Sequence, residues 1–155
     1  MTANTIPAAE RKASVESIQP LLASSLYMAR IAKHAHWNVT GPNFIGIHRL
    51  LDEVYEAAED WADSLAERIR GLGGTALGTP DQMIEGSLLK LKGDYAVENQ
   101  EEYIDLVASS LGLLSKAFRV RVEALDDSDP GTSNMLQDLT LKADHFIYLL
   151  ESHRG

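Results

Sequence analysis

Four long segments of the chain carry apolar side chains at three- and four-residue intervals, the period of an α-helix that buries one face. They span about residues 17–39, 43–72, 99–125 and 130–150, and no segment alternates as a half-buried strand would. No apolar run approaches the roughly 20 residues of a membrane-spanning helix. The absence of cysteine excludes disulfides and thiolate metal sites. The pattern predicts one all-α domain over residues 1–155.

Turn-forming and capping residues mark where these helices should begin and end. Residues 1–13 are expected to form a flexible tail, and Pro20 is expected in the first turn of the first helix, where a missing N–H costs little. The Thr-Gly-Pro sequence at 40–42 should end that helix. Asn99 is suited to cap the third helix, in a capping box, and Asp129 to cap the fourth.

The connection between the second and third helices is long, covering residues 73–98. Within it, Thr79 and Pro80 have the order of an N-cap and a first helical residue, which predicts a short extra helix. A crossover of this length lets the third helix run in the same direction as the second. Four amphipathic helices with one long crossover predict a ferritin-like four-helix bundle.

The second helix carries histidine and carboxylate side chains away from its apolar stripe. His48 and Asp52 are four residues apart and share a face, as do Asp63 and Glu67. At about 100° per residue, this face lies roughly 140° from the core stripe, outside the bundle. Imidazole and carboxylate together suit iron or zinc. A solvated polar face is the ordinary alternative for such a pattern.

A single chain cannot bring these two pairs together. Helical rise separates Asp52 from Asp63 by roughly 16 Å and His48 from Glu67 by roughly 28 Å. The pairs are, however, placed symmetrically about residues 57–58, where two alanines would allow close approach. If the helix crosses a second copy of itself antiparallel there, each His48-Asp52 pair meets the partner's Asp63 and Glu67. We therefore expect two equivalent metal sites across a two-fold interface.

His36 is a further candidate ligand, in the last turn of the first helix. The Gly-Pro turn at 41–42 can fold it back towards the start of the second helix. A structural histidine, favoured at a helix C-terminus by the helix dipole, is the alternative. His34 points to another face and is left out of the predicted site.

Together these residues resemble the signature of the Dps family of mini-ferritins. The resemblance is carried by His36-Trp37-Asn38-Val39-Thr40-Gly41-Pro42-Asn43-Phe44, His48, Asp52, Asp63, Ala66-Glu67-Arg68 and Leu72-Gly73. Helix order and length extend it over essentially the whole chain. It implies a ferroxidase that stores iron in a hollow dodecameric shell. The catalytic, metal-binding residues would be His36, His48 and Asp52 of one subunit with Asp63 and Glu67 of its mate.

The resemblance also implies a chemistry for the site. Two Fe(II) ions would bind at each inter-subunit site, with Glu67 as the bridging carboxylate, and zinc could occupy the same ligands. Hydrogen peroxide is the expected oxidant, with dioxygen as the other choice, and the result is protection from oxidative stress. Trp37 would intercept stray oxidising equivalents, or alternatively pack in the interface.

Iron must also reach the inside of such a shell. In the family, acidic pores lie near the start of the last helix, and Asp126, Asp127 and Asp129 occupy that region here. Carboxylates at this density would attract cations. A solvated, well-capped turn is the structural alternative.

Three other functions fit the sequence less well. A DNA-protecting nucleoid protein needs cations for phosphate, but residues 1–13 offer only Arg11 and Lys12, and the net charge is −9. DNA binding is therefore expected to be weak. A di-iron enzyme with its site inside the bundle needs Glu-x-x-His motifs, which are lacking. A non-catalytic helical assembly protein would leave the ligand pattern unexplained. Without a signal-peptide layout in the first 30 residues, a soluble cytoplasmic homo-oligomer that binds no membrane is expected.

Overall fold

The structure, a computed structural model, describes residues 3–91 and 99–154. Over these residues it consists of α-helices and contains no strand, which confirms the predicted all-α fold. The helices are α1 (Ala8–Asn38), α2 (Phe44–Gly71), α3 (Pro80–Gly86), α4 (Gln100–Leu125) and α5 (Pro130–Glu151). The predicted connection over residues 92–98 lies outside the described residues.

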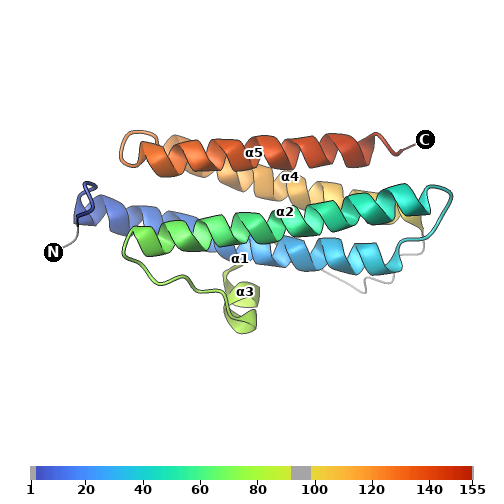
Figure 1. The fold of residues 1–155 in the computed structure, drawn as a ribbon, viewed down its shortest axis with the longest axis horizontal. Helices are drawn as coiled ribbons and strands as arrows, with labels where there is room; N and C mark the ends of the chain where they lie inside the picture. Colours follow the sequence, from blue (N-terminus) through green and yellow to red (C-terminus); the bar gives the residue numbers. More distant parts are fainter. Residues whose placement is uncertain (1–2, 92–98, 155) are drawn as a thin grey trace.

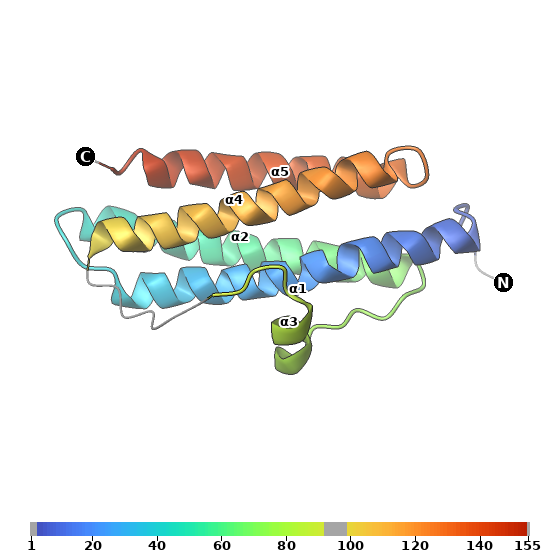
Figure 2. The same cartoon turned by 180° about the vertical axis from the view of Figure 1, so that it is seen from behind.

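The four long helices lie side by side as two antiparallel pairs (Figure 1). The pairs α1–α2 and α4–α5 each make extensive contact, and α4 crosses α1 between them. Helix α4 runs in the same direction as α2, as the long crossover predicted (Figure 2). The short helix α3 lies against the flank of α1. This arrangement is the four-helix bundle with an extra helix in the crossover.

The apolar stripes predicted from the sequence form the core. On α2, the side chains from Ile47 to Ile69 that recur at helical spacing are buried. At the centre, the Trp61 ring packs edge-on against Phe118, with 6.1 Å between ring centroids, and lies 6.3 Å from Phe146. Burying each such large side chain contributes roughly 1.5–3 kcal/mol. The core therefore fixes which face of α2 points outward.

Helix α1 begins earlier than predicted. It starts at Ala8 rather than near Ser17, so residues 8–13 are helical and do not belong to a flexible tail. Pro20 consequently lies inside the helix and not in its first turn. The helix continues through the proline because the residues on both sides of it pack against the core, as buried Ile18, Leu21 and Leu22 show. The prediction was wrong because it took Pro20 as a sign that the helix begins nearby.

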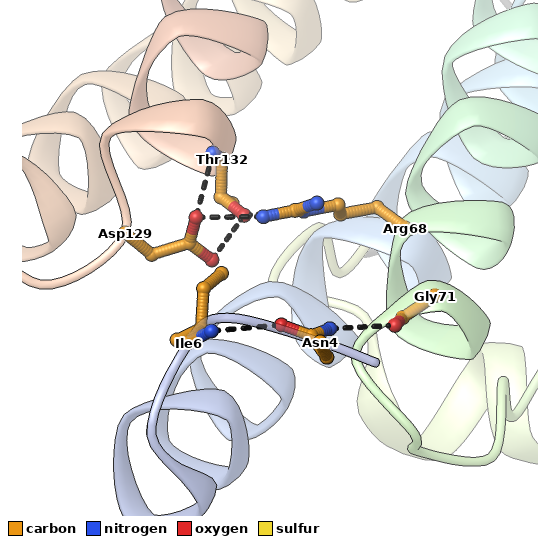
Figure 3. Close-up of polar contacts among 6 residues, drawn as sticks. All are labelled: Asn4, Ile6, Arg68, Gly71, Asp129 and Thr132. Carbon is orange, nitrogen blue, oxygen red and sulfur yellow. Dashed lines mark hydrogen bonds and ion pairs between the residues drawn. The ribbon is translucent and has the colours of Figure 1, made fainter. Parts of the chain in front are cut away.

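The segment before α1 is held against the end of α2 (Figure 3). The Asn4 amide donates to the Gly71 carbonyl at 3.1 Å, and its oxygen accepts from the Ile6 N–H at 2.9 Å. The Arg11 guanidinium donates to the Ile6 carbonyl at 2.6 Å. These bonds tie residues 4–11 to the bundle.

The predicted capping residues begin the later helices. Thr79 and Gln82 form a complete capping box at α3. Asn99 accepts from the Glu102 N–H at 3.0 Å at the start of α4. Asp129 accepts from the Thr132 N–H at 3.1 Å at the start of α5. In the described part of the chain, none of the helices combines the length and apolar character needed to cross a bilayer.

Candidate metal site

Two histidine side chains stack where α1 ends and α2 begins. The rings of His36 and His48 lie 3.7 Å apart between centroids, with 21° between their planes. Nδ1 of His36 is 2.7 Å from the His48 carbonyl, and Nδ1 of His48 is 2.8 Å from the His36 carbonyl. A carbonyl oxygen only accepts, so each Nδ1 carries the proton and donates it. The lone pair of each neutral ring is therefore on Nε2, as a metal ligand requires.

The turn between the helices sets this pairing. Gly41 has φ +133°, a backbone conformation that residues with a side chain rarely adopt. A Cβ added there would meet Gln100 Oε1 at 3.0 Å. That same oxygen accepts from the Asn43 N–H at 3.1 Å. Gln100, only 7% exposed, thereby connects the start of α4 to the turn that brings His36 next to His48.

Asp52 lies one turn along α2 from His48 and carries an ion pair. The Lys33 ammonium on α1 donates to its Oδ1 and also lies 4.5 Å from the centroid of the Tyr55 ring. The hydrogen bond from Lys33 lowers the pKa of Asp52 despite partial burial, and the nearby His36 and His48 add to the effect. A cation thus occupies the carboxylate that the sequence assigns to a metal.

Asp63 and Glu67 lie further along the same helix, exposed to solvent. Asp63 borders a depression of about 320 Å³ between α1, α2 and the residues after α2. Across residues 3–91 and 99–154, no three histidine or carboxylate side chains converge as a metal site would need. One chain brings His36, His48 and Asp52 into one region and leaves Asp63 and Glu67 apart, and the two-fold hypothesis requires this separation.

The centre of the expected crossing differs from the sequence interpretation. Ala58 is fully buried in the core of its own chain, so it does not offer a small surface to a second helix. The residues on the ligand face at this position are Glu56 and Glu59. Glu59 accepts an ion pair from Arg30 of α1 at 2.6 Å. For Ala58 the prediction of a close contact was therefore wrong, because this residue lies on the core side of α2. Ala57 is half-buried, and its contact with a second helix stays a prediction.

The three aspartates assigned to an uptake pore have different environments. Asp126 and Asp127 are exposed. Asp129 is 1% exposed and accepts from the Arg68 guanidinium at 2.7 Å and from the Thr132 hydroxyl at 2.5 Å (Figure 3). Burial acts to raise the pKa of Asp129, but its hydrogen bonds with Thr132 and the Arg68 charge outweigh burial and lower it. Asp129 caps α5 and joins it to α2, so its carboxylate is not free to line a pore.

Several residues around the site were not singled out from the sequence. Lys33 precedes His36 by about one helical turn, a spacing that places both on one side of α1 but does not show that Lys33 contacts Asp52. Arg30 lies one turn earlier still. Arg68 is part of the family resemblance, but its ion pair with Asp129 was not predicted. Trp37, the proposed radical trap, is 67% exposed at the end of α1. It makes a large apolar surface beside the histidine pair.

Comparisons of the sequence and of the fold with known proteins agree on the kind of relative that they find. The ferritin-like domain family matches residues 15–155. A "DNA protection during starvation protein" from Mycolicibacterium smegmatis is 33% identical, over 99% of this chain and 85% of its own length. The structure of Mycobacterium smegmatis Dps in a tetragonal form superposes with a TM-score of 0.89 at 26% identity, covering 99% of this chain and 93% of that one. Dps from Microbacterium arborescens in a high iron form gives 0.87 at 27% identity, covering 99% and 97%.

Proposed function

Because this chain belongs to the Dps family of ferritin-like proteins, we propose that it is a ferroxidase that stores the iron it oxidises. Its substrate is Fe(II), bound between two subunits of a homo-oligomeric, dodecameric shell. The observation that carries the proposal is the stacked histidine pair, whose backbone hydrogen bonds leave both Nε2 atoms available to metal.

The donor set fits two iron ions per site. His36, His48 and Asp52 of one subunit face Asp63 and Glu67 of its mate, and the mixed imidazole and carboxylate ligands suit iron, with zinc as a substitute. Glu67 is the bridging carboxylate. The Lys33 ammonium, which pairs with Oδ1 of Asp52, competes with iron for that oxygen.

The proposed reaction is a two-electron reduction of peroxide. Each of two Fe(II) ions gives one electron, the O–O bond breaks, and two protons complete two waters, so hydroxyl radical is not released. Dioxygen is the alternative oxidant. Trp37 intercepts stray oxidising equivalents or packs against the second subunit. Asp126 and Asp127 remain as candidates for iron uptake, whereas the buried ion pair of Asp129 argues against its inclusion.

The test is anaerobic loading with Fe(II), addition of hydrogen peroxide, and measurement of Fe(III) absorbance in the wild type and in Glu67→Ala. We expect about two Fe(II) oxidised per peroxide, with the fast phase largely lost in the variant. Glu53→Ala is the matched control, since Glu53 is exposed on α2 but outside the ligand face. Wild-type rates no faster than those of iron in buffer, or equal rates in Glu67→Ala, would overturn the proposal.

Protection of DNA by binding it is the second candidate; a relative from Mycolicibacterium smegmatis carries the name "DNA protection during starvation protein". The net charge of −9 argues against it, because an acidic surface repels phosphate.

A further inference from the structure

The ligand face of α2 carries titratable side chains whose spacing, but not whose charge, is the same in both directions along the helix. We call them the palindromic stripe: His48, Asp52, Glu56, Glu59, Asp63 and Glu67. Successive members are spaced by four, four, three, four and four residues. All six lie on one side of the helix because each step is about one turn. The outer members are the proposed iron ligands, and Glu56 and Glu59 occupy the centre.

The symmetry has an electrostatic consequence in the proposed dimer. When two copies of α2 cross antiparallel at this centre, Glu56 of each chain faces the partner's Glu59. Two glutamates from each chain would then meet at the axis. Like charges placed opposite one another disfavour association. An interface with this stripe therefore needs a cation at its centre.

Arg30 of the same chain lies beside Glu59, at the centre of the palindromic stripe. Its guanidinium is 2.6 Å from Glu59 and 5.1 Å from the centroid of the Tyr55 ring, against which it is held. About half of the Arg30 side chain remains exposed, on the same surface as the stripe. A guanidinium presents several N–H donors in a planar fork and can bind two carboxylates at once. The bond to Glu59 is made by one terminal nitrogen of the guanidinium.

We propose that Arg30 bridges the dimer by binding Glu59 of its own chain and the partner's Glu56. Two such bridges, related by the axis, hold the acidic centres together and set the register of the two α2 helices. That register places each His48 beside the partner's Glu67. Arg30 is thus a positioning residue that recognises a second copy of this chain. The inference rests on the proposed two-fold site.

The test measures assembly without iron. Metal-free Arg30→Gln and wild type are diluted, and particle mass is followed by light scattering. We expect the subunit concentration at half-dissociation to rise about tenfold or more in the variant, as for the loss of a paired interfacial charge. Arg119→Gln is the matched control, because Arg119 forms an exposed ion pair with Asp144 at 3.2 Å on the far helix pair. It should change the value less than about twofold.

A double-mutant cycle with Glu56→Gln tests the contact across the axis. In the wild-type background this substitution should weaken assembly, because the bridge loses its second carboxylate. In the Arg30→Gln background it should strengthen assembly, because it removes a repulsion that no cation now offsets. Independent effects of the two substitutions, or Arg30→Gln dissociating like Arg119→Gln, would overturn the bridge.

The two proposals fail in different ways. If the wild-type chain stays monomeric at every concentration, both the two-fold site and the bridge are wrong. If the wild type assembles and oxidises iron, and loses that oxidation in Glu67→Ala, while Arg30→Gln assembles normally, then only the bridge is wrong.

Discussion

At the scale of single residues, backbone geometry fixes the two histidines that we propose as iron ligands. His36 and His48 exchange hydrogen bonds with each other's carbonyls, which fixes ring orientation as well as tautomer. Neither ring must rotate or move a proton between its nitrogens before binding. The same is not true of Asp52, whose carboxylate is already bound to Lys33.

We predict that Lys33→Met raises the affinity for metal at this site. Methionine keeps the apolar stem over the Tyr55 ring but removes the ammonium that competes for Asp52. The expected gain is about three- to tenfold in affinity, corresponding to an ion pair of roughly 1 kcal/mol. Calorimetric titration with Zn(II) measures it without oxidation.

Lys142→Met controls for the loss of positive charge. Lys142 pairs with Asp138 on α5 at 2.7 Å, on a different part of the surface. Its substitution should leave the Zn(II) affinity unchanged. If the Zn(II) affinity is also unchanged in Lys33→Met, the Lys33 ammonium does not compete with metal for Asp52.

The candidate ligands could be predicted from the sequence, but their cationic neighbours could not. His48, Asp52, Asp63 and Glu67 lie on one helix, where spacing alone determines the shared face. Lys33 and Arg30 reach that face from α1, and their contacts depend on how two helices are rotated against each other. Periodicity within either helix does not supply that angle.

At the scale of helices and turns, the features set by a few neighbouring residues, such as N-caps, were the most predictable. The caps Thr79, Asn99 and Asp129 begin the helices that their side chains predicted. The predicted start of α1 was wrong, because packing along the bundle keeps Pro20 inside a continuous helix. Burial of an apolar face contributes more than one lost backbone hydrogen bond.

The turn between α1 and α2 gives a prediction at this scale. Gly41→Ala should destabilise the protein by about 1–3 kcal/mol, because alanine is strained at φ +133° and its Cβ would press on Gln100. Zn(II) affinity should fall with it, since this turn holds His36 against His48. Guanidinium denaturation at fixed subunit concentration provides the first measurement, and titration the second.

Gly112→Ala is the matched substitution. Gly112 lies within α4, and a Cβ added there meets no other group within 4 Å. Alanine should therefore stabilise the helix by roughly 0.5–1 kcal/mol. Similar effects at the two glycines would show that the turn is not specifically constrained.

At the scale of the whole molecule, charge decides between the two candidate functions. The net charge of the chain is −9, and assembly multiplies it. The cations nearest the ends of the described chain are also engaged. Arg11 donates to the Ile6 carbonyl, Lys12 pairs with Glu16, and Arg154 pairs with Asp105. Phosphate binding needs several accessible cations in one region.

We therefore predict that the protein protects DNA without binding it. In a gel-shift assay at low salt and neutral pH, plasmid mobility should not change, because the acidic surface repels phosphate. When Fe(II) and hydrogen peroxide are added, wild-type protein should nevertheless prevent nicking of supercoiled plasmid by removing the iron before hydroxyl radical forms. Glu67→Ala should give no such protection, and Glu53→Ala should protect as the wild type does. Tight complexes in the gel, or protection that survives in Glu67→Ala, would instead assign the protection to physical shielding of the DNA.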